Sequence, residues 1–297
     1  MRLWLTVAAL LLLAASPPSP DPEPESNGRI VGGIPALPGS ARWQVEMRRS
    51  TPFKKSSIVP DWQRRHACGG VLIAPEWVLT AAHCAVDTPD DRLTENYIIR
   101  AGSLDLNAPM REYRIVRAMI HKDYRASGPP ANDIALLRIE LKGPPVAVAE
   151  EPAPIALLNS GGPVLPATAR VVVTGWGRTE AGVRTSVPGT LLAAVLRLIP
   201  VGECKIAGTN APLDAAQQLC AGPGDPARPA DSCQGDSGGP MTWLAPGRGQ
   251  RPVWYLVGLV SWGPDGVCGG GSPGIYTNLR NYLGWIELAK QSAGGRV

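Results

Sequence analysis

The chain has 297 residues, of which 44% are hydrophobic and 18% charged, so it can bury a sizeable core and is neither disordered nor fibrous. Its formal net charge of +4 is smaller than the basic excess expected of a nucleic-acid-binding protein. The 34 glycines and 31 prolines favour many turns and short strands over long helices.

The first residues are typical of a secretory signal peptide. Arg2 precedes an apolar run from Leu3 to Ala15 that is too short to span a bilayer comfortably, so we interpret residues 1–15 as a signal peptide, with a membrane anchor as the alternative. Residues 16–29 are rich in proline and lack large apolar side chains, so we expect them to stay unfolded. Such an exposed segment ending at Arg29 is a natural site of proteolytic cleavage.

The rest of the chain has the pattern of an all-β barrel or sandwich. From residue 30 to about residue 280, short apolar runs alternate with turn residues. One helix is predicted near the end, where apolar residues recur at helical spacing and give one apolar face from about Asn278 to Ala289. The clearest predicted strands are Gly70–Ile73, Ile134–Leu137, Arg170–Val173 and Leu256–Val260.

The six cysteines indicate disulfide bonds, because an exported chain meets an oxidising environment and the count is even. Their number and spacing alone do not choose among the possible pairings.

Three residues supply the parts of a nucleophilic catalytic site. A serine hydroxyl is a poor nucleophile at neutral pH and needs a base, whose tautomer a carboxylate fixes. His83, Asp133 and Ser237 offer the base, the carboxylate and the nucleophile in that chain order. Taken singly, each has a structural interpretation: a histidine beside a cysteine, a turn cap before a strand, and a tight glycine turn. The surrounding segments favour the catalytic interpretation.

In those segments the chain resembles the trypsin-like serine proteases of the chymotrypsin family, in the family's order. The resemblance implies one protease domain over residues 30–297, made of two antiparallel six-stranded β-barrels at about 30–150 and 151–277 and a C-terminal helix at about 278–290. The site would lie between the barrels. The matching segments are Arg29-Ile30-Val31-Gly32-Gly33, Cys68-Gly69-Gly70, Thr80-Ala81-Ala82-His83-Cys84, Asn132-Asp133-Ile134-Ala135-Leu136, Gly175-Trp176-Gly177, Asp231 to Pro240, Ser261-Trp262-Gly263 and Pro273-Gly274-Ile275-Tyr276-Thr277.

The resemblance also implies an oxyanion hole and an activation step. The backbone N–H groups of Gly235 and Ser237 would stabilise the developing alkoxide. Cleavage after Arg29 would free the α-amino group of Ile30, which would pair with a buried Asp236 and order the site. The uncleaved chain is therefore expected to be an inactive zymogen.

Specificity for Arg or Lys follows from Asp231, which the resemblance puts at the base of the primary pocket. A surface Asp in a turn is the structural alternative. The other residues assigned to substrate binding are Ser232, the pocket walls Gly263 and Gly274, and Ser261 and Trp262 of a substrate-pairing strand. The resemblance also pairs the cysteines as Cys68–Cys84, Cys204–Cys220 and Cys233–Cys268.

The expected protein is thus a secreted, extracellular or periplasmic serine endopeptidase that works through an acyl-enzyme. We expect a monomer whose partners are polypeptide substrates with Arg or Lys at the cleaved bond and protein protease inhibitors. Nucleic acid, and membrane after signal removal, are not expected partners. The alternative is a catalytically inactive homologue that acts as a binding protein, although a replaced triad residue would normally mark such a loss.

The chain departs from the compact family members in residues 45–67, a longer segment with a basic cluster. It is either an exosite for acidic partners or a solvated insertion. No metal or cofactor is expected. Gly102–Glu112, where relatives bind calcium, is poor in carboxylates, Pro273 replaces the aromatic residue of sodium-regulated members, and the histidines lack zinc spacing.

Overall fold

The computed structural model describes residues 33–51, 59–86, 92–125, 130–159, 161–180, 183, 185–206, 212–224, 230–246, 251–264, 268 and 271–294. The predicted signal peptide, the segment 16–29 and the cleavage site at Arg29 and Ile30 lie outside these residues.

The first barrel is built from six antiparallel strands and is closed. Its order is β2-β3-β4-β7-β6-β5, with β2 pairing both β3 and β5. Alternate positions such as Val45 and Met47 fill its core together with Ile99 and Leu137. The strands are β2 (Gln44–Arg49), β3 (His66–Ala74), β4 (Trp77–Thr80), β5 (Tyr97–Ala101), β6 (Arg111–Ile120) and β7 (Ala135–Leu141).

The second barrel is also closed, because β9 pairs with both β10 and β12. Val171, Val173, Leu196 and Met241 lie in its core. Its strands are β9 (Arg170–Gly175), β10 (Leu192–Ile199), β11 (Gln218–Pro223), β12 (Pro240–Ala245), β13 (Val253–Trp262) and β14 (Gly274–Asn278). Two short strands extend the sheet, β1 (Ile34–Pro35) on β10 and β8 (Ala156–Leu157) on β13.

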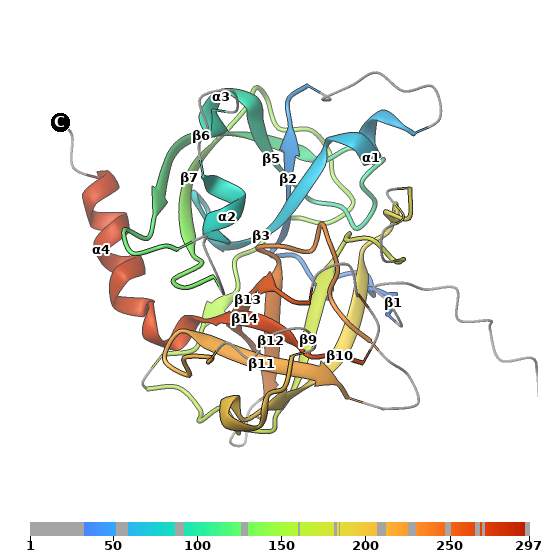
Figure 1. Ribbon diagram of the computed structural model, residues 1–297. Helices are drawn as coiled ribbons and strands as arrows, with labels where there is room; N and C mark the ends of the chain where they lie inside the picture. Colours follow the sequence, from blue (N-terminus) through green and yellow to red (C-terminus); the bar gives the residue numbers. More distant parts are fainter. Residues whose placement is uncertain are drawn as a thin grey trace, which may run out of the picture.

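A third apolar cluster joins the two barrels to the last helix. Leu79 and Leu136 of the first barrel pack in it with Leu256 and Leu259 of the second and with Ile286 of α4. In Figure 1 the barrels lie one above the other, and α4 runs along one side of both. The predicted fold of two six-stranded antiparallel barrels with a C-terminal helix is confirmed.

The C-terminal helix begins later than the apolar pattern predicted. Residues Leu279–Asn281 form a 3-10 turn (η2), and Tyr282 (φ −106°, ψ 2°) separates it from α4 (Leu283–Gly294). Leu279, Tyr282 and Ile286 are nevertheless all buried, so the turn keeps the predicted face on the core. The remaining helices are α1 (Asp61–Arg65), α2 (Ala82–Ala85), α3 (Leu93–Asn96) and η1 (Val201–Glu203).

The three disulfides Cys68–Cys84, Cys204–Cys220 and Cys233–Cys268 confirm the predicted pairing. In the described part of the chain, no helix has both the length and the apolar character needed to cross a membrane.

Candidate active site

His83 and Asp133 form a directly bonded pair in the first barrel. His83 lies on α2, and its Nδ1 is 2.8 Å from Asp133 Oδ2, while its backbone N–H donates to Oδ1 at 3.0 Å. The Asp133 side chain is 2% exposed, whereas that of His83 is 31% exposed. One edge of the imidazole is therefore held by a buried carboxylate, and the ring still reaches the surface.

Groups from the second barrel complete the surroundings of Asp133. Ser261 Oγ on β13 donates to Asp133 Oδ2 at 2.5 Å, and Thr277 Oγ1 on β14 donates to the Asp133 carbonyl oxygen at 2.6 Å. Burial by itself would raise the pKa of Asp133, but the hydrogen bonds and charge of His83 and the bond from Ser261 leave it lowered. The carboxylate is thus kept ionised beside the imidazole.

The backbone before Asp133 adopts a conformation that few residues tolerate. Asn132 has φ 53°, in the left-handed region where Asn is among the better-tolerated side chains. Its Oδ1 accepts from the Tyr282 hydroxyl at 3.0 Å, and its N–H donates to Gln217 Oε1 at 3.1 Å. These bonds tie the Asp133 turn to the second half of the chain.

Ser237 lies in a glycine-rich turn whose main chain contacts the main chain of the first barrel. Gly69 N–H donates to the Ser237 carbonyl oxygen at 2.8 Å, and Cys84 Sγ lies 3.7 Å from the same oxygen. A Cβ on Gly238 would lie 2.1 Å from Thr80 Oγ1, so this approach requires glycine. The turn therefore brings Ser237 beside α2, the helix that carries His83.

The carbonyl groups of Gln234 and Gly235 both contact a nitrogen of another segment. Its φ of 104° requires glycine, and a Cβ would lie 3.1 Å from Gly177 Cα. The Gln234 carbonyl accepts from Arg178 N–H at 2.8 Å, and the Gly235 carbonyl lies 3.0 Å from His66 Nε2. In a planar trans peptide the N–H points away from the C=O, so the bond to the Gln234 carbonyl fixes where the Gly235 N–H points.

Asp236 is fully buried between two glycines. Its carboxylate accepts from Gly177 N–H at 2.7 Å and Cys233 N–H at 2.8 Å. Cβ atoms on Gly175 or Gly177 would lie 2.0 Å and 2.3 Å from its oxygens. Burial raises the pKa of Asp236 to about 6 despite these bonds. The Ile30 amine, its proposed partner, belongs to a residue outside the described ones.

Asp231 lies with other residues predicted to form the primary pocket. It is 6% exposed, and a Cβ on Gly274 would be 3.5 Å from its Oδ1. Ser232 Oγ lies 3.1 Å from the hydroxyl of Tyr276, and burial together with the Asp231 charge raises the pKa of that hydroxyl. A Cβ on Gly263 would meet no atom of the described residues within 4 Å.

A sequence model of the family described as Trypsin matches residues 30–286. The chain belongs to the trypsin family. Membership supports a serine-type peptidase that acts on polypeptides, and the fold and the three disulfides agree with it. The matched region begins at Ile30 and includes every residue predicted for catalysis and specificity.

This trypsin-family protein also contains a buried ionic cluster that the sequence analysis missed. His66 Nδ1 lies 3.4 Å from Glu46 Oε1, and Arg100 Nη1 donates to Glu46 Oε2 at 2.8 Å. Glu46 is fully buried on β2, where the alternation with Val45 and Met47 would place it in solvent. The sequence offered one sign of this cluster, a Glu that stands between two apolar residues within a strand.

The described basic residues of the 45–67 segment contact the protein itself. Asp61 of α1 pairs with Arg48 at 3.8 Å, Arg64 at 3.0 Å and Arg65 at 2.6 Å. Arg49 lies over the Tyr97 ring at 4.7 Å. The described part of the segment is therefore neither a plain solvated loop nor a set of free cations, and Lys54 and Lys55 lie outside the described residues.

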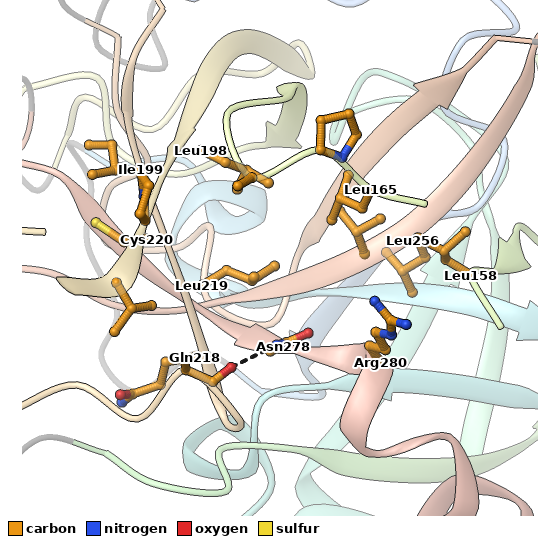
Figure 2. A pocket seen from close by; sticks show the side chains of 16 residues that line it. Leu158, Leu165, Leu198, Ile199, Gln218, Leu219, Cys220, Leu256, Asn278 and Arg280 are labelled. Atoms are coloured by element: carbon orange, nitrogen blue, oxygen red, sulfur yellow. Dashed lines mark hydrogen bonds between the residues drawn. The ribbon is translucent and has the colours of Figure 1, made fainter. Parts of the chain in front are cut away.

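A possible metal-binding group and a cavity on the second barrel do not contribute to the candidate site. Cys68, His83 and Cys84 lie close enough to share a metal ion, but the two sulfurs are joined in a disulfide and offer no thiolate. A cavity of about 220 Å³ lies on the second barrel, lined mainly by apolar side chains such as Leu198 and Leu219 (Figure 2). It contains no residue predicted for catalysis or specificity.

Proposed function

We propose that this protein is a secreted serine endopeptidase, made as a zymogen, that hydrolyses peptide bonds after Arg or Lys. The observation that carries the proposal is the His83–Asp133 pair at 2.8 Å with the Ser237 turn bonded to Gly69 beside it, in a chain of the trypsin family. These residues are the general base, its orienting carboxylate and the nucleophile of acyl transfer.

In the proposed reaction, Ser237 Oγ attacks the carbonyl carbon of the scissile bond while His83 Nε2 takes its proton. Asp133 keeps the other ring nitrogen protonated and stabilises the imidazolium that forms. His83 then gives the proton to the leaving amine, and an acyl-enzyme on Ser237 remains. A water molecule, activated by His83 in the same way, releases the acid product and restores the hydroxyl.

The oxyanion of each tetrahedral intermediate is received by the N–H groups of Gly235 and Ser237. The held orientation of the peptide units around Gly235 supports this role. Preorganised donors of this kind each contribute about 3–4 kcal/mol to transition-state stabilisation, because they need no reorientation during the reaction.

Preference for Arg or Lys is supported by the buried carboxylate of Asp231 next to the small residue Gly274. A long cationic side chain would bring an opposite charge to this carboxylate, which an apolar side chain cannot do. Ser261 and Trp262 are the last two residues of β13, the strand along which an extended substrate would add.

Activation by cleavage after Arg29 is supported by the buried Asp236 carboxylate and by the start of the family match at Ile30. The new α-amine would supply the cation that this site needs. Secretion through the 1–15 signal peptide agrees with the three disulfides, and we propose a monomer that protein protease inhibitors can bind.

The test uses the full chain after limited trypsin cleavage, with the trypsin then removed. We expect a fluorophosphonate probe to label the wild type and not Ser237→Ala, and tripeptide amides ending in Arg or Lys to be hydrolysed. Asp231→Ser should still be labelled but lose Arg cleavage by orders of magnitude. An unlabelled wild type, correctly cleaved at Arg29, would instead indicate the inactive binding protein, and an unchanged preference in Asp231→Ser would refute the pocket assignment.

A further inference from the structure

A helix inserted between β2 and β3 contacts a loop of the other barrel. Gln63 of α1 is 9% exposed, and its Nε2 donates to the carbonyl oxygens of Thr185 at 2.8 Å and Val187 at 3.2 Å. Those residues belong to the loop between β9 and β10, which lies beside α1 in Figure 1. A side chain of the first barrel thus fixes two main-chain groups of the second.

The loop passes this contact on to the oxyanion hole through hydrogen bonds. Ser186, between the two acceptors of Gln63, has a carbonyl that accepts from the N–H of Thr179 at 3.1 Å and from its hydroxyl at 2.8 Å. Arg178, which precedes Thr179, donates its N–H to the Gln234 carbonyl at 2.8 Å. That carbonyl shares a planar peptide unit with the Gly235 N–H, so its direction decides where the proposed oxyanion donor points.

A second contact reaches the same turn from the end of α1. His66 follows Arg65 directly, has a side chain that is 2% exposed, and lies 3.0 Å through Nε2 from the Gly235 carbonyl. Its other nitrogen faces Glu46, which Arg100 holds. Arg100 in turn donates to the carbonyl oxygens of Leu106 and Ala108. The buried imidazole is therefore held at the carbonyl by its Nε2 contact, with the Glu46 carboxylate 3.4 Å from its other nitrogen.

The helix that carries these contacts is itself anchored. Asp61 pairs with Arg48 of β2 at 3.8 Å, and Arg65 Nη1 donates to the Ser50 carbonyl at 2.9 Å. Trp62 packs in a cluster with Leu106 and Trp176, whose neighbours Gly175 and Gly177 enclose Asp236. Arg48 and Arg65 thus link α1 to β2 and to Ser50, the residue that follows β2.

We propose that α1 is a brace for the oxyanion hole and that Gln63 is a positioning residue, acting through residues 185–187 and Arg178 on the Gly235 N–H. The inference rests on the proposed function, because an oxyanion hole matters only to an enzyme that forms a tetrahedral intermediate. Among the described residues, the hydrogen bonds of the brace do not involve the Asp236 carboxylate, which accepts instead from Gly177 and Cys233.

The test compares Gln63→Met with Gln218→Met in the cleaved, full-length protein. Methionine keeps the length of the side chain and removes its hydrogen bonds. Gln218 is a matched control because it is 7% exposed and donates to a backbone carbonyl, that of Pro130, away from the Gln234 turn. Three measurements are made. The first is kcat and KM for a tripeptide amide, with the enzyme concentration taken from active-site titration. The others are the thermal unfolding temperature and the hydrogen exchange of the peptides that contain Arg178 and Gly235.

We expect Gln63→Met to lower kcat about tenfold with KM within about twofold, because oxyanion donors act on the transition state. Exchange at Arg178 should quicken in this variant alone, while both variants lose similar thermal stability. An unchanged kcat, or equal losses of kcat in the two variants, would overturn the brace. Hydrogen exchange needs no turnover and therefore tests the brace separately. An inactive wild type would refute the proposed function, and the exchange rate of Arg178 would still decide whether Gln63 holds the loop.

Discussion

The buried carboxylate of Asp236 should give the uncleaved chain a distinctive pH dependence of stability. Before cleavage, residue 30 carries an amide and no α-amine, so no N-terminal cation faces this carboxylate. Its pKa is raised to about 6 by burial, against an ordinary value of 3.8. Between these two values the folded chain keeps a proton that the unfolded chain has lost, so stability falls as pH rises.

The size of this effect follows from the two pKa values. One pKa unit of difference corresponds to about 1.4 kcal/mol, so a difference of about two units lowers the free energy of unfolding by about 3 kcal/mol. The loss begins near pH 4, is complete a little above pH 6 and stays constant beyond. Carboxylates with lowered pKa values, such as Asp133 and Glu140, act in the opposite direction at lower pH.

The assay isolates Asp236 by comparison with Asp236→Asn. Both proteins should carry Arg29→Gln, which removes the proposed cleavage site, and Ser237→Ala, which removes the proposed nucleophile. Urea unfolding followed by tryptophan fluorescence at pH 3 to 7.5 gives the free energy at each pH. The stability of the Asp-containing protein relative to the Asn variant should drop by about 3 kcal/mol across this range. Parallel profiles would refute the reasoning, because the Asn variant has no proton to lose.

Two further predictions concern the Ser237 turn and the carboxylate of Asp133. Gly238→Ala should lower the free energy of unfolding by about 2–4 kcal/mol in urea denaturation, because φ is +75° and the new Cβ would lie 2.7 Å from the Gly69 carbonyl oxygen. The control Gly284→Ala should not lower it, because no atom of the described residues outside its own helix backbone lies within 4 Å of the new Cβ. Ser261→Ala should lower kcat about tenfold in steady-state assays, because Asp133 Oδ2 loses a hydrogen bond that holds its carboxylate beside His83; an unchanged kcat would contradict this role.

Individual strands and the His83–Asp133 pair could be predicted from sequence because their signals are local, whereas the arrangement in two barrels was predicted from the family resemblance. Runs such as Arg170–Val173 and Leu256–Val260 lie within observed strands, and the motifs around His83 and Asp133 are contiguous. The start of α4 was missed because a 3-10 turn keeps the same residues buried as a helix would. Periodicity alone does not separate the two over one turn.

The brace was not predictable for a different reason. A five-residue helix such as α1 is too short to be stable alone, so its formation depends on contacts with distant residues such as Thr185. Glu46 is buried because both faces of β2 are covered once the barrels and the insertion meet, and a period of two assumes one wet face. Such groups become recognisable only after the two halves of the chain are placed together.

The contact between Gly69 and the Ser237 turn has a consequence for how this protein can vary. A Cβ on Gly69 would lie 3.0 Å from Gly239 Cα, so the two barrels meet there through bare main chain. At this contact the distance between the Ser237 turn and the first barrel is therefore set by peptide geometry, unlike in the apolar cluster that also joins the barrels, where side chains fill the space. Any residue larger than glycine at position 69 would push the two main chains apart.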